Sequence, residues 1–209
     1  MPVDLPSLVA PEHTAVLTME MQRGVVGDLG TLGALGDAVR EQEVIPNTAR
    51  LLGAARAAGA RVVHCLAEFR PDLAGSAFNC PMLAVMRRRP GNMQIGTPAV
   101  ELVPELGPEP SDIATGRMHG MAPFVGTELD SILRNLGVRT VVATGVSVNI
   151  GVLGMVIEAV DYGYQVVLPT DAVAGVPKDY ADAVIANTLA LLATVTTVDQ
   201  IIDAWKGAA

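Results

Sequence analysis

Short apolar runs alternate along this chain with segments in which apolar residues recur at helical spacing. The apolar runs predict buried strands at residues 14–19, 61–66, 112–115, 141–146, 164–168 and 194–198. The helical spacing predicts helices at 44–58, 128–136, 152–160 and 177–193, with short helical pieces at 100–106 and 201–205. This alternation favours right-handed β-α-β units and therefore an α/β fold with a six-stranded, mostly parallel, doubly wound sheet.

Four segments lack either pattern and are expected to be an N-terminal arm or loops: 1–13, 24–36, 68–98 and 116–125. The segment 68–98 is long for an irregular connection inside a compact domain. Such a stretch is usually a functional loop or part of a subunit contact. No repeat or linker divides the chain, so we expect a single domain over residues 1–209.

A strand, a tight turn and a helix follow one another between residues 139 and 163. This order places the backbone N–H groups around Asn149, Ile150 and Gly151 at a helix N-terminus, which favours an anion or a developing oxyanion. In the commonest strand order of such sheets, ligands bind between the first and fourth strands. Glu20 ends the first strand, so we expect it to face this turn across a shared cavity. The hydrolytic hypothesis given below depends on that geometry.

Glu20 is a carboxylate that closes an otherwise apolar strand, between Met19 and Met21. An apolar setting keeps a carboxylic acid protonated near neutral pH and so able to donate a proton. The alternative is a structural carboxylate that caps a helix or pairs with an arginine.

The other candidate side chains are an arginine, two histidines and two cysteines. Arg117 is suited to anchoring a substrate carboxylate and His119 to moving protons, although both also fit an ordinary surface loop. His64 lies inside a predicted strand and is expected to be a satisfied core histidine. Cys65 is expected to be a small buried residue, and nothing near Cys80 in the sequence activates it. The scattered histidines predict no metal site.

Composition narrows the class of protein further. Half of the residues are hydrophobic and 17% are charged, which suits a covered sheet, while only 3% are aromatic, so the core must be aliphatic. The formal charge of −8 argues against a nucleic-acid partner, and the basic run 87–89 fits a solvated loop. We see no secretion signal and no apolar run long enough for a membrane helix, so we expect a cytoplasmic protein with no membrane partner.

Two stretches carry a family resemblance: AVLTMEMQ near the start, and FVGTELDSILRNLGVRTVVATGV at 124–146. With the helix that follows, they make the chain similar to the isochorismatase-like hydrolases, the superfamily that includes nicotinamidases and many small amidases. The resemblance implies a three-layer α/β/α sandwich with a Rossmann-like sheet. It also implies a homodimer or a higher homo-oligomer.

The catalytic residues of that family correspond only in part. Most members use an Asp after the first strand, which is Glu20 here, and a nucleophilic Cys at the start of a helix, which is Gly151 here. The family lysine falls at Met118 by strict spacing or at Arg117 with a shift of one residue. The resemblance therefore does not imply a covalent cysteine step.

One branch of the family, the isochorismatases proper, carries a glycine at the cysteine position, and GVSVNIG at 145–151 is similar to its segment. Its reaction is vinyl-ether hydrolysis, which needs a proton donor and a positioned water but no covalent intermediate. The histidine of that segment is Asn149 here. The family often has a non-proline cis peptide just before this turn, which would fall near Val146–Ser147.

Two hypotheses from different classes follow. The first is a hydrolase of a small, carboxylated molecule that needs no metal or other cofactor, with Glu20 as acid or base. Its catalytic residues would be Glu20, Arg117, His119 and Gly151, and its substrate-binding residues Gln22, Phe124, Ser147, Asn149 and Ile150. The second is a catalytically inactive family member that acts as a ligand-binding or assembly protein.

Overall fold

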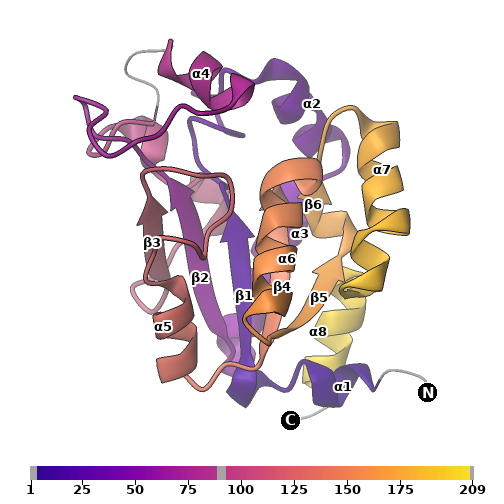
Figure 1. Cartoon of the computed structure of the whole chain (residues 1–209). Coiled ribbons are helices and arrows are strands. Elements are labelled where there is room, and N and C mark those ends of the chain that lie inside the picture. Colours follow the sequence, from indigo (N-terminus) through magenta and orange to yellow (C-terminus); the bar gives the residue numbers. More distant parts are fainter. Residues whose placement is uncertain (1–3, 89–92, 208–209) are drawn as a thin grey trace.

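The computed structural model describes residues 4–88 and 93–207. At its centre lies a parallel sheet with strands in the order β3-β2-β1-β4-β5-β7, and a further short strand, β6, pairs with the end of β4 (Figure 1). The strands are β1 (Thr14–Met19), β2 (Arg61–Ala67), β3 (Ile113–Arg117), β4 (Thr140–Val146), β5 (Gln165–Pro169), β6 (Val173–Ala174) and β7 (Thr194–Thr196). The predicted neighbourhood of the first and fourth strands is confirmed, because β1 pairs with β4 along its whole length.

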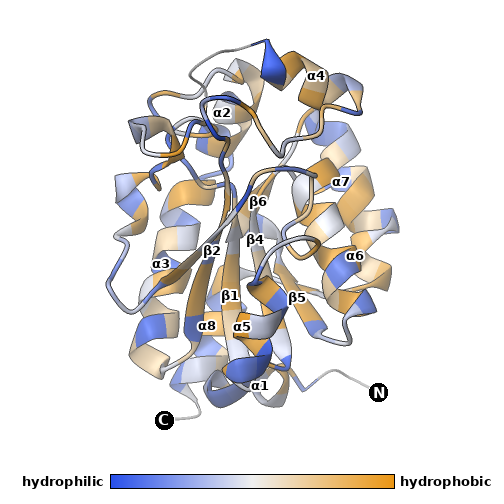
Figure 2. Ribbon diagram, turned by 60° about the vertical axis from the view of Figure 1, so that its left-hand side comes forward, coloured by the Kyte–Doolittle hydropathy of each residue, from blue (hydrophilic) through white to orange (hydrophobic). Residues whose placement is uncertain are grey.

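Helices cover both faces of the sheet and produce the three-layer sandwich that the resemblance implies (Figures 1 and 2). One face packs against α2 (Gly33–Glu41), α3 (Val44–Ala58) and α8 (Val198–Lys206). The other face packs against α5 (Leu129–Asn135), α6 (Leu153–Asp161) and α7 (Lys178–Asn187). Each face has its own aliphatic core, because successive side chains of a strand point to opposite faces. None of the described helices is long and apolar enough to cross a membrane.

Two short helices lie outside these layers. Helix α1 (Leu5–Leu8) belongs to the predicted N-terminal arm, which is held against α8 where the Trp205 indole donates a hydrogen bond of 2.6 Å to the Val9 carbonyl. Helix α4 (Pro81–Arg87) lies above the carboxyl ends of β1, β2 and β3 (Figure 1). The proline at its first position suits a helix start. The sequence predicted only a loop here, since seven residues are too few to show a helical period.

Other differences concern the ends of elements. Strand β3 continues to Arg117, which the sequence placed in a loop, because its backbone pairs with β2 up to Ala67. Helix α2 begins within the predicted loop 24–36. The expected helical piece at 100–106 consists of the 3₁₀ turns Pro98–Val100 and Pro104–Leu106, and the expected helix 177–193 ends at Asn187 before a further 3₁₀ turn. Prolines without an N–H donor limit the first of these segments to single turns.

The join between β4 and the following helix is tightly packed. Gly145 has φ +99° and lies so close to the Met19 carbonyl on β1 that a Cβ at this position would clash with it. Glycine is therefore required at 145. The Val146–Ser147 peptide bond is cis, as the resemblance implied.

Candidate active site

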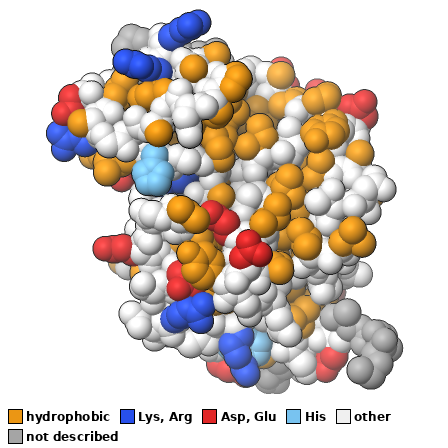
Figure 3. Space-filling view, in the orientation of Figure 1, with side chains coloured by type: hydrophobic (Ala, Val, Ile, Leu, Met, Phe, Trp, Pro, Cys, Tyr) orange, Lys and Arg blue, Asp and Glu red, His pale blue; other side chains and the backbone are white. Residues whose placement is uncertain are grey.

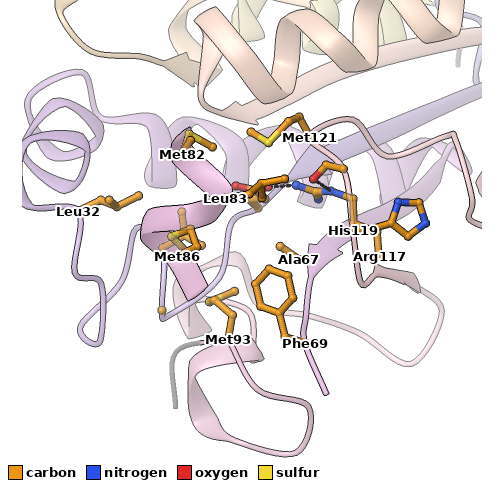
Figure 4. Close-up of a pocket in the computed structure, with 14 residues that line it drawn as sticks. Leu32, Ala67, Phe69, Met82, Leu83, Met86, Met93, Arg117, His119 and Met121 are labelled. Carbon is orange, nitrogen blue, oxygen red and sulfur yellow. Dashed lines mark hydrogen bonds and ion pairs between the residues drawn. The ribbon is translucent and has the colours of Figure 1, made fainter. Parts of the chain in front are cut away.

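Glu20 and Arg117 form an ion pair at the carboxyl end of the sheet. Glu20 follows β1 in a left-handed conformation, with φ +52°, and its N–H donates to the Cys65 carbonyl at 3.0 Å. Arg117 is the last residue of β3, and its guanidinium donates to the Glu20 carboxylate across the end of β2 (Figure 4). The two side chains are 20% and 5% exposed, respectively. The glutamate thus pairs with an arginine, as its structural alternative predicted, and that arginine is itself a candidate site residue.

The remaining nitrogens of Arg117 are only partly used. Its Nε donates to the Gly120 carbonyl at 3.4 Å, which is a long hydrogen bond. Its Nη1 is buried and has no hydrogen-bond partner among the described residues. A buried donor without a partner costs about 1–3 kcal/mol. The guanidinium is therefore held mainly by its ion pair with Glu20.

The ion pair lies at one end of a pocket of about 60 Å³. The rest of its wall is mainly apolar and comes from the loop after β1, the end of β2, α4 and the loops on either side of β3 (Figure 4). The larger apolar side chains are Phe69, Met82, Leu83, Met86, Met93 and Met121. A carboxylate and a guanidinium at the end of an apolar pocket can bind a small molecule and transfer a proton to or from it.

The turn before α6 does not line this pocket. It forms one π-helical turn, Val148–Val152, in which the Ile150 N–H already donates to the Ser147 carbonyl at 3.1 Å. Gly151 is buried, and the Met19 Cε lies 3.0 Å from the place that a Cβ of residue 151 would take. The expectation that Glu20 and this turn share a cavity is therefore wrong. Met19, which directly precedes Glu20, fills the space in front of Gly151.

Comparison with known proteins identifies the family. A family model described as "Isochorismatase domain" matches residues 14–200. The chain belongs to this family. It is 30% identical to the ureidoacrylate amidohydrolase RutB of Pantoea ananatis over 207 residues, which cover 93% of this chain and 82% of that protein. It is also 30% identical to the RutB of an Enterobacter strain, over 93% of this chain and 90% of that protein.

Solved structures of the same family have the same fold as this chain. An isochorismatase family protein from Desulfovibrio vulgaris superposes with a TM-score of 0.78 at 27% identity, over 91% of this chain and 96% of that one. A second family member, from Burkholderia thailandensis, gives a TM-score of 0.76 at 26% identity, over 93% of this chain and 96% of that one. The protein is thus an isochorismatase-like member of a hydrolase superfamily.

For this isochorismatase-like protein, the resemblance placed the family lysine at Met118 or Arg117, and His119 follows them directly in the sequence. Arg117 contacts Glu20, and Met118 is exposed. His119 lies at the rim of the pocket, and its ring packs against Gly126, with Nε2 2.7 Å from where a Cβ of that glycine would lie. In Figure 4 the ring points away from the methionine side chains. The side chain paired with the family's acidic position is therefore Arg117.

Both polar atoms of the Gln22 side chain make hydrogen bonds. It is completely buried, its amide nitrogen donates to the carbonyls of Ala67 and Val100, each at 3.0 Å, and its amide oxygen accepts from the Ala67 N–H at 2.8 Å. These bonds tie the end of β1 to β2 and to the loop before β3. A part in substrate binding, which the sequence suggested, remains a prediction.

Asn149 and Phe124 lie apart from the pocket that Glu20 lines. The Asn149 amide donates to the Val176 carbonyl at 3.3 Å, next to the start of α7. Phe124 is buried in the core beneath α5 and α6, with its ring centroid 5.5 Å from that of Tyr162 and 5.9 Å from that of Tyr164. Their predicted contacts with substrate, like that of Ser147, stay predictions.

The sequence did not single out the residues of α4 and its flanks that form the apolar wall, although it marked 68–98 as a functional loop or part of a subunit contact. A signal was present: Met82, Leu83 and Met86 have the spacing of one helical face directly after Pro81. The segment was too short for that spacing to be distinguished from chance.

A second group of polar side chains is buried between the sheet and α3. The Thr18 hydroxyl lies 2.7 Å from the His64 Nδ1, and the His64 Nε2 lies 3.3 Å from the Asp112 carboxylate, which also binds Arg56 in a bidentate pair. Burial lowers the pKa of His64, although its hydrogen bond to the Asp112 carboxylate partly opposes this. Thr18 is completely buried, so the group cannot reach a substrate, and the expectation of a core histidine is confirmed.

Neither cysteine lies in the pocket wall. Cys65 is buried on β2, and burial raises the pKa of its thiol to about 12. Cys80 directly precedes α4 and is partly exposed. Among residues 4–88 and 93–207, no three His, Cys, Asp or Glu side chains come together in a group that could hold a metal ion.

Proposed function

We propose that this isochorismatase-like protein hydrolyses a small molecule in the pocket beneath α4, with Glu20 transferring the proton and without a covalent cysteine intermediate. The proposal no longer rests on a cavity shared with the turn at Gly151, because that turn does not line the pocket of Glu20. The observation that carries it instead is that the Glu20 carboxylate and the Arg117 guanidinium meet at one end of an otherwise apolar pocket. The amidohydrolase relatives favour an amide as the bond that is broken. A vinyl ether is the alternative that the glycine at 151 suggests.

The chemistry for an amide would run as follows. The guanidinium of Arg117 holds the Glu20 carboxylate in place at the end of the pocket, and a carboxylate positioned in this way can act as a general base. Glu20 takes a proton from a water, and the water oxygen forms a bond to the amide carbonyl carbon. The C–N bond then breaks, and the proton passes from Glu20 to the leaving nitrogen, which gives a carboxylic acid and an amine. Arg117 cannot exchange protons as a lysine can, so its part is electrostatic.

The sequence suggested a carboxylated substrate on the strength of Arg117 or His119. In the structure, the charge of Arg117 is already engaged by Glu20, and the ring of His119 packs against Gly126. The proposal therefore keeps a small substrate but does not require a carboxylate on it.

The decisive variant is Glu20→Gln. It preserves the size of the side chain and removes the proton acceptor, so we expect turnover to fall by roughly 10²–10⁴-fold, the usual contribution of general acid–base catalysis. The assay would use a panel of small amides, esters and enol ethers, and thermal unfolding would confirm that the variant is folded. Full activity of the folded variant would rule the mechanism out.

A catalytically inactive binding or assembly protein is the second candidate. Two observations favour it: Met19 fills the space in front of Gly151, and the Ile150 N–H that was expected to hold an oxyanion is already bonded. A thermal-shift screen followed by turnover assays on every stabilising compound separates the two candidates. Stabilisation by compounds that are never converted would support the inactive protein.

We further propose that the chain forms a homo-oligomer through the outer face of α6. Hydrophobic side chains gather over this helix in Figure 3, where Ile157 is 41% and Val160 37% exposed. A patch of this kind is usual at subunit contacts. Light scattering after size exclusion tests this, since Ile157→Glu should give a smaller species than the unmodified protein. A cytoplasmic location remains a prediction.

A further inference from the structure

We propose that the pocket selects an uncharged substrate in which an apolar group of a few carbons carries the bond to be hydrolysed. This inference rests on the proposed function, because it assigns the substrate class of the same site. It differs from the sequence-based expectation of a carboxylated substrate, and the evidence for it lies in the walls and in the charges of the pocket.

The pocket walls are apolar and adaptable. Phe69, Leu83 and Met93 form a buried part of the wall, whereas Met82 and Met86 approach from α4 and are more exposed (Figure 4). With Met121, four methionines line the pocket. Their unbranched thioether side chains adjust to the shape of an apolar group and make favourable contacts with aromatic rings. Such a wall offers an apolar ligand contact area but few hydrogen bonds.

The buried part of this wall is fixed by backbone pairing. The Phe69 N–H donates to the Met93 carbonyl at 2.7 Å, and the Ile95 N–H donates to the Phe69 carbonyl at 2.9 Å. Gly24 makes room for the methionine, because a Cβ at position 24 would lie only 2.6 Å from the Met93 sulfur. Backbone hydrogen bonds and close packing therefore hold this part of the wall in place.

The two charged side chains at the end of the pocket have no net charge when taken together. Glu20 and Arg117 contact each other and cancel in charge. A substrate carboxylate at this end would meet the carboxylate of Glu20. A neutral carbonyl carries no net charge for the Glu20 carboxylate to repel. Arg87, on α4, lies over the Phe78 ring at 5.4 Å and does not line the pocket.

Matched pairs of small ligands test this directly. Binding of butanamide, hexanamide, butanoate and hexanoate would be measured by calorimetry on the full chain and on Glu20→Gln. Burying each added methylene should tighten amide binding roughly fourfold, so hexanamide, which has two more methylenes, should bind roughly fifteenfold tighter than butanamide. Each acid should bind roughly tenfold weaker than its amide, and this gap should shrink in Glu20→Gln. Acids that bind as tightly as the amides, or affinities that ignore chain length, would overturn the inference.

A pair of variants on α4 checks the location. Met86→Glu places a charge in the pocket wall and should weaken hexanamide binding by roughly tenfold or more. Val85→Glu is the control, since Val85 is 48% exposed on the same helix and does not line the pocket. It should bind hexanamide as the unmodified protein does. Equal effects of the two variants would place the ligand elsewhere.

The outcomes also separate this inference from the proposed function. If the amides bind with the expected length dependence but no amide, ester or enol ether of the panel is turned over, the ligand class stands and the hydrolase proposal falls. If short polar or anionic compounds are hydrolysed in preference, hydrolysis stands and the substrate class proposed here is wrong.

Discussion

Met19 and Gly151 share one space between β1 and α6. The Cε and Cγ of Met19 lie 3.0 and 3.4 Å from the position that a Cβ of residue 151 would take, and the Val146 carbonyl oxygen lies 3.1 Å from it. A side chain at 151 therefore requires Met19 to move. The methionine occupies the place in which the resemblance implies a nucleophilic cysteine in most family members.

This packing predicts that a cysteine cannot simply be restored. Gly151→Cys should destabilise the fold by about 1–3 kcal/mol through overpacking, and Met19→Ala by about 2–5 kcal/mol through a cavity. The double variant should cost clearly less than the sum, because the new side chain fills the cavity. Urea denaturation of all three proteins measures this. Costs that add within about 0.5 kcal/mol would show that the two positions do not compete for space.

Removing one partner of the Glu20–Arg117 pair should destabilise the protein. Arg117→Met leaves a mostly buried carboxylate without its partner, and we expect a loss of about 1–3 kcal/mol in the free energy of unfolding. Adding Glu20→Gln should recover part of it. The control is Arg70→Met, which breaks the exposed pair with Asp72 and should cost less than about 1 kcal/mol. An equal loss in the two single arginine variants would contradict a special role for the buried pair.

Activity should not depend on a thiol. Burial raises the pKa of Cys65 to about 12, so alkylation in the native state should reach only Cys80. Mass spectrometry after iodoacetamide treatment should find one modified cysteine. Cys80→Ser should retain activity and should lose none on treatment. Inactivation of Cys80→Ser by the reagent would point to Cys65 and to a cysteine mechanism.

His64 should make the fold sensitive to mild acid. Its pKa in the folded protein is lowered by burial, so the unfolded chain takes up a proton first as the pH falls below about 6.5. Stability should then decline by at most about 1.4 kcal/mol per pH unit until the folded protein is protonated as well. Thermal unfolding at a series of pH values from about 7.5 to about 5 compares the unmodified protein with His64→Gln. The variant should show the smaller decline, and identical profiles would refute the assignment.

Local patterns in the sequence determined most of the elements. The strand at 14–19 and the helix at 44–58 have the predicted bounds, because continuous apolar runs and helical spacing are local properties. Pairing of the first and fourth strands followed from the alternation of strands and helices. Strand β6 and helix α4 were missed, since two and seven residues carry too little pattern.

Tertiary structure alone decided how the candidate site is built. The sequence predicted that Glu20 and the turn at Gly151 lie at the same end of the sheet, but it could not show which way each side chain points. Met19 faces the core beneath α6, and Glu20, in its left-handed conformation, reaches the arginine at the end of β3. Glu20 and Arg117 are far apart in the sequence. Their contact therefore depends on the order and the register of the strands. The apolar pocket follows for the same reason, because its walls come from segments that only folding brings together.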